Sequence, residues 1–203
     1  MIKDEASARE FVSSIADRSA TERLELLVAA LKVENRKQNL ISRASEDEMW
    51  QRHIADSAQL LRFVSRETSQ PWLDLGTGAG FPGLVIAAIL PETQMVLVES
   101  RMRRVDWLRQ VCEDLALNQC RVEGRRLELV KPFVASVISA RAFAPLPKLL
   151  HLSAPFSTKA TTYLLPKGRS AAQELSDLPA KSRKLFHVEQ SLTNPDAGII
   201  VSI

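Results

Sequence analysis

The stretch WLDLGTGAGFPG, residues 72–83, places four glycines within eight positions directly after a short apolar run. A P-loop is excluded, because no Gly-Lys-Ser/Thr follows the turn to hold phosphates and magnesium. The dinucleotide fingerprint G-x-G-x-x-G, counted from Gly76 and Gly78, would need a third glycine where Phe81 stands. What remains is an acid at a strand end followed by glycines at every second position: Asp74, Gly76, Gly78 and Gly80.

Short β-rich runs alternate with helical patterns from residue 71 onward. The runs WLDL, MVLVE, CRVE, SVISA and TTYLL are predicted as strands, and segments 82–90, 101–117 and about 146–152 as helices. This alternation is typical of a parallel, doubly wound sheet. The runs LFHVE and GIIVSI suit an antiparallel pair at the sheet edge. Ligands of such sheets bind outside the carboxyl ends of the strands, beside the first strand, where the glycine turn falls.

Up to about residue 66 the pattern is helical throughout. Three Ser-x-x-Glu sequences, each typical of a capping box at a helix start, precede apolar residues at helical spacing: Ser7 with Glu10, Ser19 with Glu22, and Ser45 with Glu48. We therefore expect an N-terminal helical extension over residues 1–66 and an α/β core over residues 71–203, within a single domain of residues 1–203.

The composition is typical of soluble globular chains, with 45% hydrophobic and 25% charged residues. The longest apolar runs are too short to span a bilayer, and the sequence MIKDEASARE lacks the apolar segment of a secretion signal. Cys112 and Cys120 have no metal-binding spacing. We expect a cytoplasmic, monomeric protein without a membrane partner or a metal site.

The glycine pattern resembles motif I of the class I S-adenosylmethionine-dependent methyltransferases. This cofactor has no pyrophosphate, so the turn must admit its amino-acid end and its ribose close to the backbone. Asp74 would favour the cationic ammonium of the cofactor. Glu99 closes the second predicted strand, about where an acid meets ribose hydroxyls in nucleotide-binding βαβ units. The resemblance implies a Rossmann-like fold of three layers, α/β/α, around a mostly parallel seven-stranded sheet.

The residues after the fourth predicted strand bear on which atom receives the methyl group. The sequence SVISARAFAPL lacks the Asp/Asn-Pro-Pro-Tyr/Phe motif of exocyclic-amine methylases, and no cysteine nucleophile of the carbon-5 pyrimidine methylases stands there. Lys167 is a candidate base for ribose 2′-oxygen methylation, but no acid partner accompanies it. Guanine N7 carries a lone pair and no proton, so a site without a general base is consistent with that acceptor.

Several motifs together resemble the bacterial small-subunit (16S) rRNA guanine-N7 methyltransferase family RsmG, also called GidB. They are NLIS (39–42), RHIADS (52–57), DLGTGAGFPG (74–83), VES (98–100) with a basic run, WLRQV (107–111), GRRLE (124–128), ISARAFAPL (138–146) and LPKG (165–168). The resemblance implies methylation of a guanine in the decoding-region (530) loop, with 16S rRNA or the small ribosomal subunit as partner. Methylation of another RNA position, or RNA binding without catalysis, are the alternatives.

The resemblance adds site residues to those found from the glycine pattern. It implies cofactor contacts by Gly76, Phe81, Leu127, Glu128 and Arg141, besides Asp74, Gly78, Gly80 and Glu99. Arg141 could instead meet an RNA phosphate or a guanine edge. His53, Asp56 and Ser57 share one helical face and become candidates, with Arg141, for positioning the substrate, and a His53 that titrates near neutrality would matter.

Positive charge and aromatic rings give the expected RNA contacts. The formal net charge is +3, and arginines crowd the start of the predicted helix 101–117. Phosphate contacts are expected from Arg101, Arg103, Arg104 and Lys167, although a solvated face would look the same. Unpaired bases could stack on Phe81 or Phe143.

Overall fold

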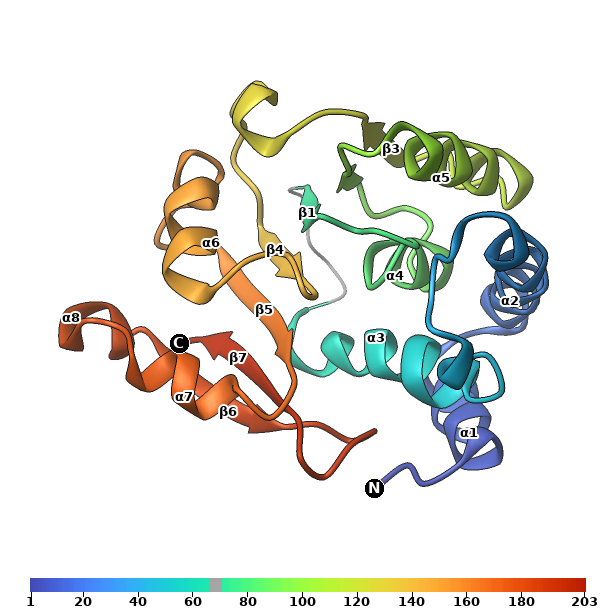
Figure 1. Cartoon of the computed structure of the whole chain (residues 1–203), viewed down its shortest axis with the longest axis horizontal. Coiled ribbons are helices and arrows are strands. Elements are labelled where there is room, and N and C mark those ends of the chain that lie inside the picture. Colours follow the sequence, from blue (N-terminus) through green and yellow to red (C-terminus); the bar gives the residue numbers. More distant parts are fainter. Residues whose placement is uncertain (66–70) are drawn as a thin grey trace.

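A computed structural model describes residues 1–65 and 71–203. Within these residues, seven strands form one sheet in the order β3-β2-β1-β4-β5-β7-β6 (Figure 1). They are β1 (Trp72–Leu75), β2 (Met95–Val98), β3 (Cys120–Glu123), β4 (Val137–Ala140), β5 (Thr162–Lys167), β6 (Phe186–Gln190) and β7 (Gly198–Ser202). β1 to β5 are parallel, whereas β7 runs antiparallel to both β5 and β6. Every predicted strand is present, and the predicted fold class is confirmed.

Helices cover both faces of the sheet (Figure 1). One face packs on α4 (Gly83–Ile89), α5 (Met102–Asp114) and the N-terminal helices, and the other packs on η4 (Leu127–Leu129), α6 (Leu146–Ser153) and α7 (Ala171–Ser176). Two short helices complete this part, η5 (Ala154–Phe156) and α8 (Ala180–Arg183). Alternate residues of β1 divide between the two cores, since Trp72 belongs to one and Leu73 to the other.

The N-terminal extension is helical as predicted, but its helices begin elsewhere. α1 (Glu5–Ile15) is capped by Asp4, whose carboxylate accepts from Ser7 N, and α2 (Arg18–Gln38) is capped by Asp17, which accepts from Ala20 N. The prediction that Ser7 and Ser19 begin these helices as capping residues is therefore wrong, because the preceding aspartate takes the cap position in each case. The third, Ser45, lies in η1 (Arg43–Ser45) and hydrogen-bonds the His53 ring.

A single irregular helical segment follows, made of η2 (Trp50–Ala55), α3 (Asp56–Ala58) and η3 (Gln59–Phe63). η2 is a π-helical turn, a form often found at functional sites. Its first N–H groups are capped from outside, because the Glu5 carboxylate of α1 accepts from Trp50 N at 3.1 Å and Gln51 N at 2.8 Å. α1 and η2 are thereby fixed to each other.

The N-terminal residues meet the loop between β6 and β7 beside this segment. Ile2 N donates to Leu192 O at 2.8 Å, in the loop between β6 and β7. The Gln51 amide donates to Ile2 O and to Thr193 O, both at 3.2 Å. The Gln51 side chain thus joins Ile2 to the loop between β6 and β7.

Candidate functional site: a glycine cradle beside a clamped arginine

The turn after β1 has the backbone conformation that its glycines predict. Gly76, Gly78 and Gly80 have φ values of +61°, +60° and +110°, which side-chain-bearing residues rarely adopt. A Cβ at Gly76 would lie 2.5 Å from Phe143 Cδ2, and one at Gly80 would lie 2.2 Å from Leu84 Cδ1. A Cβ at Gly78 would meet no clash, since its nearest neighbour, Arg104 Nη1, would lie 3.7 Å away, at ordinary van der Waals distance. The first and third glycines are required by packing, and the second leaves room above the turn.

Asp74 lies beneath the turn and is fully buried. Its Oδ1 accepts from Ser139 Oγ at 2.6 Å, across the pairing of β1 with β4, and its Oδ2 accepts from Gly83 N at 3.0 Å, at the start of α4. Burial raises the pKa of Asp74 to about 6, against the opposing effect of these hydrogen bonds. Asp74 therefore holds β1, β4 and α4 together, and any influence on a cofactor ammonium would act through space and not by contact.

Glu99 follows β2 and is 6% exposed. Its Oε1 accepts from Ser100 N at 2.7 Å and from Arg101 N at 2.9 Å, which fixes the carboxylate at the entry to α5. Its Oε2 lies 3.7 Å from Arg104 Nη1, the same guanidinium nitrogen that faces Gly78. Arg104 thus lies over the glycine turn, whereas Arg101 and Arg103 are exposed on the surface of the molecule.

A cavity of about 460 Å³ opens beside the turn. It brings together four residues that the sequence assigned to the cofactor, Gly76, Glu99, Leu127 and Glu128. Phe143 and Ala142, which were not assigned to the cofactor, also line it. Ala142 has a φ of +53°, an uncommon value for alanine that often marks a functional site. This backbone turn places Phe143 over Gly76 while the neighbouring Arg141 points elsewhere.

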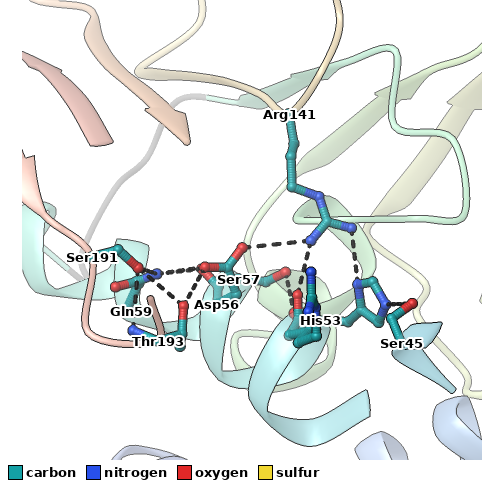
Figure 2. A network of polar contacts seen from close by, with 9 residues as sticks. Ser45, His53, Asp56, Ser57, Gln59, Arg141, Ser191 and Thr193 are labelled. Carbon is teal, nitrogen blue, oxygen red and sulfur yellow. Dashed lines mark hydrogen bonds and ion pairs between the residues drawn. The ribbon is translucent and has the colours of Figure 1, made fainter. Parts of the chain in front are cut away.

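Arg141 follows β4 and lies outside that cavity, in a polar network (Figure 2). Its Nη1 lies 3.5 Å from Asp56 Oδ2 and donates to the Arg52 carbonyl oxygen at 3.3 Å. Its Nη2 lies 3.3 Å from His53 Nδ1. The predicted positioning residues His53, Asp56 and Arg141 are therefore in contact. Ser57 is buried, and its hydroxyl donates to the His53 carbonyl oxygen.

The expectation that His53 titrates near neutrality is wrong. Burial, and next the positive charges of Arg141 and Arg52, lower the pKa of His53 to about 3. The ring is 9% exposed and stacks on Phe81, with centroids 5.0 Å apart and planes 12° apart. His53 is therefore a neutral hydrogen-bonding group at physiological pH.

Phe81 cannot stack on an RNA base, contrary to expectation. It is 2% exposed, with the His53 ring on it and the Arg141 guanidinium 5.0 Å from its centroid. Lys167 is also engaged within the protein, since its ammonium bonds Glu174 Oε2 at 2.8 Å and the Ala144 carbonyl oxygen at 3.1 Å. Phe143 is half-buried. It lines both the cavity beside the glycine turn and a second cavity, which Arg141 also lines.

The chain matches known proteins over most of its length. The family model GidB, described as rRNA small subunit methyltransferase G, matches residues 20–197. A ribosomal RNA small subunit methyltransferase G of Erythrobacter litoralis is 61% identical over 99% of this chain and 97% of its own length. A protein of the same name from Sphingopyxis alaskensis is 50% identical, covering 99% and 87%. The chain belongs to the GidB family.

Solved structures support the fold of this GidB-family chain. Fibrillarin of Aeropyrum pernix, in complex with natively bound S-adenosyl-L-methionine, aligns with a TM-score of 0.56 at 14% identity, over 75% of each chain. MtNAS, in complex with MTA and tNA, aligns with a TM-score of 0.59 at 11% identity, over 98% of this chain and 75% of its own. At such identities the likeness concerns the fold alone.

Two features are absent from residues 1–65 and 71–203. No helix there is long and apolar enough to cross a membrane. Nor does this part of the GidB-family chain hold three or more His, Cys, Asp or Glu side chains arranged for a metal ion.

The lowered pKa of His53 predicts a loss of stability in acid. The folded protein keeps His53 neutral down to about pH 3, whereas the unfolded chain takes up a proton below about pH 6.5. Stability from this residue is therefore lost as the pH falls between these values. From pH 7 to pH 5 the unfolding free energy of the wild type should fall by about 2 kcal/mol more than that of His53→Asn, measured in urea. His151→Asn, at an exposed position on α6, is the control, and equal slopes for wild type and His53→Asn would contradict the prediction.

Proposed function

We propose that this protein transfers a methyl group from S-adenosylmethionine to guanine N7 in the decoding-region loop of 16S rRNA. The observation that carries the proposal is the cradle: glycine backbone with positive φ after β1, an acid fixed at the end of β2, and a cavity that joins them. The names of the GidB relatives support the rRNA substrate.

The residues present are suited to the cofactor. A Cβ at Gly78 would meet only Arg104 Nη1, at 3.7 Å, and Gly76 O, at 3.8 Å, so a ligand would approach this bare backbone beside the Arg104 guanidinium. Glu99 would accept from the ribose hydroxyls, and Leu127, 3% exposed, would pack against adenine with Glu128 beside it. S-adenosylmethionine supplies an electrophilic methyl group when bound, and the chain has only to hold the acceptor in line with it.

The titratable groups around the cradle favour an acceptor that needs no general base. His53 is neutral but turns Nδ1 to Arg141 and Nε2 to Ser45. Asp74 is buried with both oxygens engaged, and Lys167 is paired with Glu174. A ring nitrogen with a free lone pair can be methylated by positioning alone, which separates guanine N7 from ribose hydroxyls.

The RNA would approach over the exposed start of α5 and the edge of the two cavities. We assign phosphate contacts to Arg101 and Arg103, and base stacking to Phe143. Arg104 and Lys167 are engaged by Glu99 and Glu174 within the protein, so we assign Arg104 to the cofactor side and give Lys167 no RNA contact. We further propose that the N-terminal helices and the α/β core act as one domain in a cytoplasmic monomer.

Reversing the charge of Arg101 and Arg103 together, each to Glu, should weaken rRNA binding without changing S-adenosylmethionine affinity. Both residues are exposed, and each lost phosphate interaction should reduce the slope of log Kd against log salt by about one, so the double variant should reduce it by about two. Filter binding over a salt series measures this slope. Lys159→Glu is the control, because Lys159 is exposed before the start of β5, whereas Arg101 and Arg103 follow the end of β2, so they lie at opposite ends of the parallel strands. An unchanged slope in the double variant would place the RNA on another surface.

Methyl transfer is tested directly with labelled cofactor. The protein is incubated with 16S rRNA and with small subunits from a strain that lacks the modification, and the label is mapped by cleavage at N7-methylguanosine. Label at one guanine of the decoding-region loop is expected. Label elsewhere would support methylation of another RNA position, and RNA binding without any label would support the non-catalytic alternative.

A further inference from the structure

The Arg141 guanidinium has N–H groups that its protein contacts leave unengaged. Contacts to Asp56 and to the Arg52 carbonyl oxygen use Nη1, and the contact to His53 uses one N–H of Nη2. Within the described residues, Nε–H and the second N–H of Nη2 have no partner. Nε and Nη2 form one edge of the guanidinium, the arrangement that binds two oxygens of a carboxylate or a phosphate.

Arg141 is also placed where a ligand could reach it. Its side chain is 25% exposed, and it lines two cavities of about 410 and 680 Å³. The larger one shares Ala142, Phe143 and Ala144 with the cavity at the glycine cradle. The guanidinium therefore lies between the cofactor side and the open side of the site.

His53 sets the orientation of this guanidinium through a fixed tautomer. A guanidinium only donates, so the contact of Arg141 Nη2 with His53 Nδ1 requires a bare Nδ1 and a proton on Nε2. That proton points at Ser45 Oγ, 3.0 Å away, whose own hydroxyl donates to the Ser42 carbonyl oxygen at 2.9 Å. Ser45 thus accepts from His53 Nε2, and His53 Nδ1 stays without a proton and accepts from Arg141. Figure 2 draws both contacts.

Asp56 fixes the other side of the guanidinium and is itself anchored. Its Oδ1 accepts from Thr193 Oγ1 at 2.6 Å and from Gln59 Nε2 at 2.9 Å. The side-chain Oε1 of Gln59 in turn accepts from Leu192 N at 2.8 Å. Arg141, from the end of β4, therefore contacts the segment 45–59, and the loop 191–193 braces this segment through Asp56 and Gln59 (Figure 2).

We propose that His53 is a positioning residue, a neutral acceptor locked by Ser45, which aims the free N–H edge of Arg141 at a substrate oxyanion. The inference rests on the proposed function for the identity of that oxyanion: the methionine carboxylate of the cofactor or a phosphate of the target RNA. Both present two oxygens to the same fork, and His53 itself touches neither.

Two conservative variants separate this role from simple packing. An asparagine at position 53 can place its amide oxygen near the position of Nδ1, whereas a glutamine reaches the position of Nε2. The ligand affinity of His53→Asn should stay within about threefold of that of the wild type. The affinity of His53→Gln should fall about tenfold or more, as expected for loss of a hydrogen bond to a charged group. Ser45→Ala should weaken binding in the same way as His53→Gln, although Ser45 contacts neither Arg141 nor ligand. His151→Asn is the matched control.

The source of the oxyanion is read from binding measurements, which do not depend on methyl transfer. Calorimetry uses S-adenosylmethionine and methylthioadenosine, which lacks the carboxylate, and filter binding uses 16S rRNA. If His53→Gln and Ser45→Ala lose affinity for S-adenosylmethionine but not for methylthioadenosine, the oxyanion is the carboxylate. If they lose affinity for rRNA alone, the oxyanion is a phosphate. Equal ligand affinities of His53→Asn and His53→Gln would overturn the proposal. So would a His53→Gln protein that binds every ligand as tightly as the wild type. A wild type that binds both ligands without transferring methyl would contradict the proposed function only.

Discussion

Gly78→Val abolishes binding of S-adenosylmethionine while the protein stays folded. The backbone at Gly78 has a φ of +60°, so a β-branched residue there costs about 1–3 kcal/mol in strain. Its Cβ would meet nothing closer than 3.7 Å, and the core is therefore undisturbed. The isopropyl group would instead project into the space above the turn, where the ligand must approach the backbone. We expect affinity to fall about 100-fold or more, with the melting temperature lowered by no more than about 10 °C.

Calorimetry and thermal unfolding followed by circular dichroism measure these two effects. Gly78→Ala is the graded control, because its single methyl group carries a similar backbone strain but fills less of the space, and it should lose less affinity. A Gly78→Val protein that binds the cofactor as tightly as the wild type would show that the cofactor does not lie over this turn.

Gly83→Ala should destabilise the fold strongly. A Cβ at Gly83 would lie 2.2 Å from Leu97 Cδ2 and 2.8 Å from Asp74 Oδ2, and both side chains are fully buried. Overpacking of this kind costs about 1–3 kcal/mol. Displacing Asp74 also disturbs the hydrogen bond from Gly83 N to a buried carboxyl, which is worth about 1.5–3 kcal/mol. We expect the unfolding free energy to fall by about 3–5 kcal/mol.

Urea denaturation of the wild type and of two alanine variants tests this expectation. Gly168→Ala is the matched control, since no atom lies within 4 Å of a Cβ there, and it should stay within about 0.5 kcal/mol of the wild type. Similar stabilities of Gly83→Ala and Gly168→Ala would mean that α4 can move away from β2 and β1 at little cost.

The sheet was predictable from the sequence because each of its signals is local. The predicted run WLDL is β1 as it stands, and the predicted antiparallel pair is β6 with β7. The glycine turn was also predictable, since positive φ is a property of single residues. The helix starts were not, because Asp4 and Asp17 compete with Ser7 and Ser19 for the same orphan N–H groups, and spacing alone does not decide between them.

The motifs selected residues that lie together in the fold, but they did not predict the burial and charge of these side chains. The motifs named His53, Phe81 and Arg141, but their burial and charge depend on contacts between segments far apart in the sequence. Arg141 meets the His53 ring across 88 positions, and burial of the ring, followed by the positive charge of Arg141, lowers the pKa of His53. The neighbour of Arg141 that sequence reasoning left out of the cofactor site, Ala142, could be found only from its backbone conformation.

The contacts between the N-terminal segment and the loop 191–193 have a consequence for how the protein is made. Asp56 and Gln51, which hold the segment around His53, are hydrogen-bonded to residues 191–193, and Ile2 is tied to the same loop. Thr193 follows Asp56 by 137 positions, so the bond between them can form only after translation has passed residue 193. A chain interrupted before residue 191 lacks the Thr193 contacts of Asp56 and Gln51.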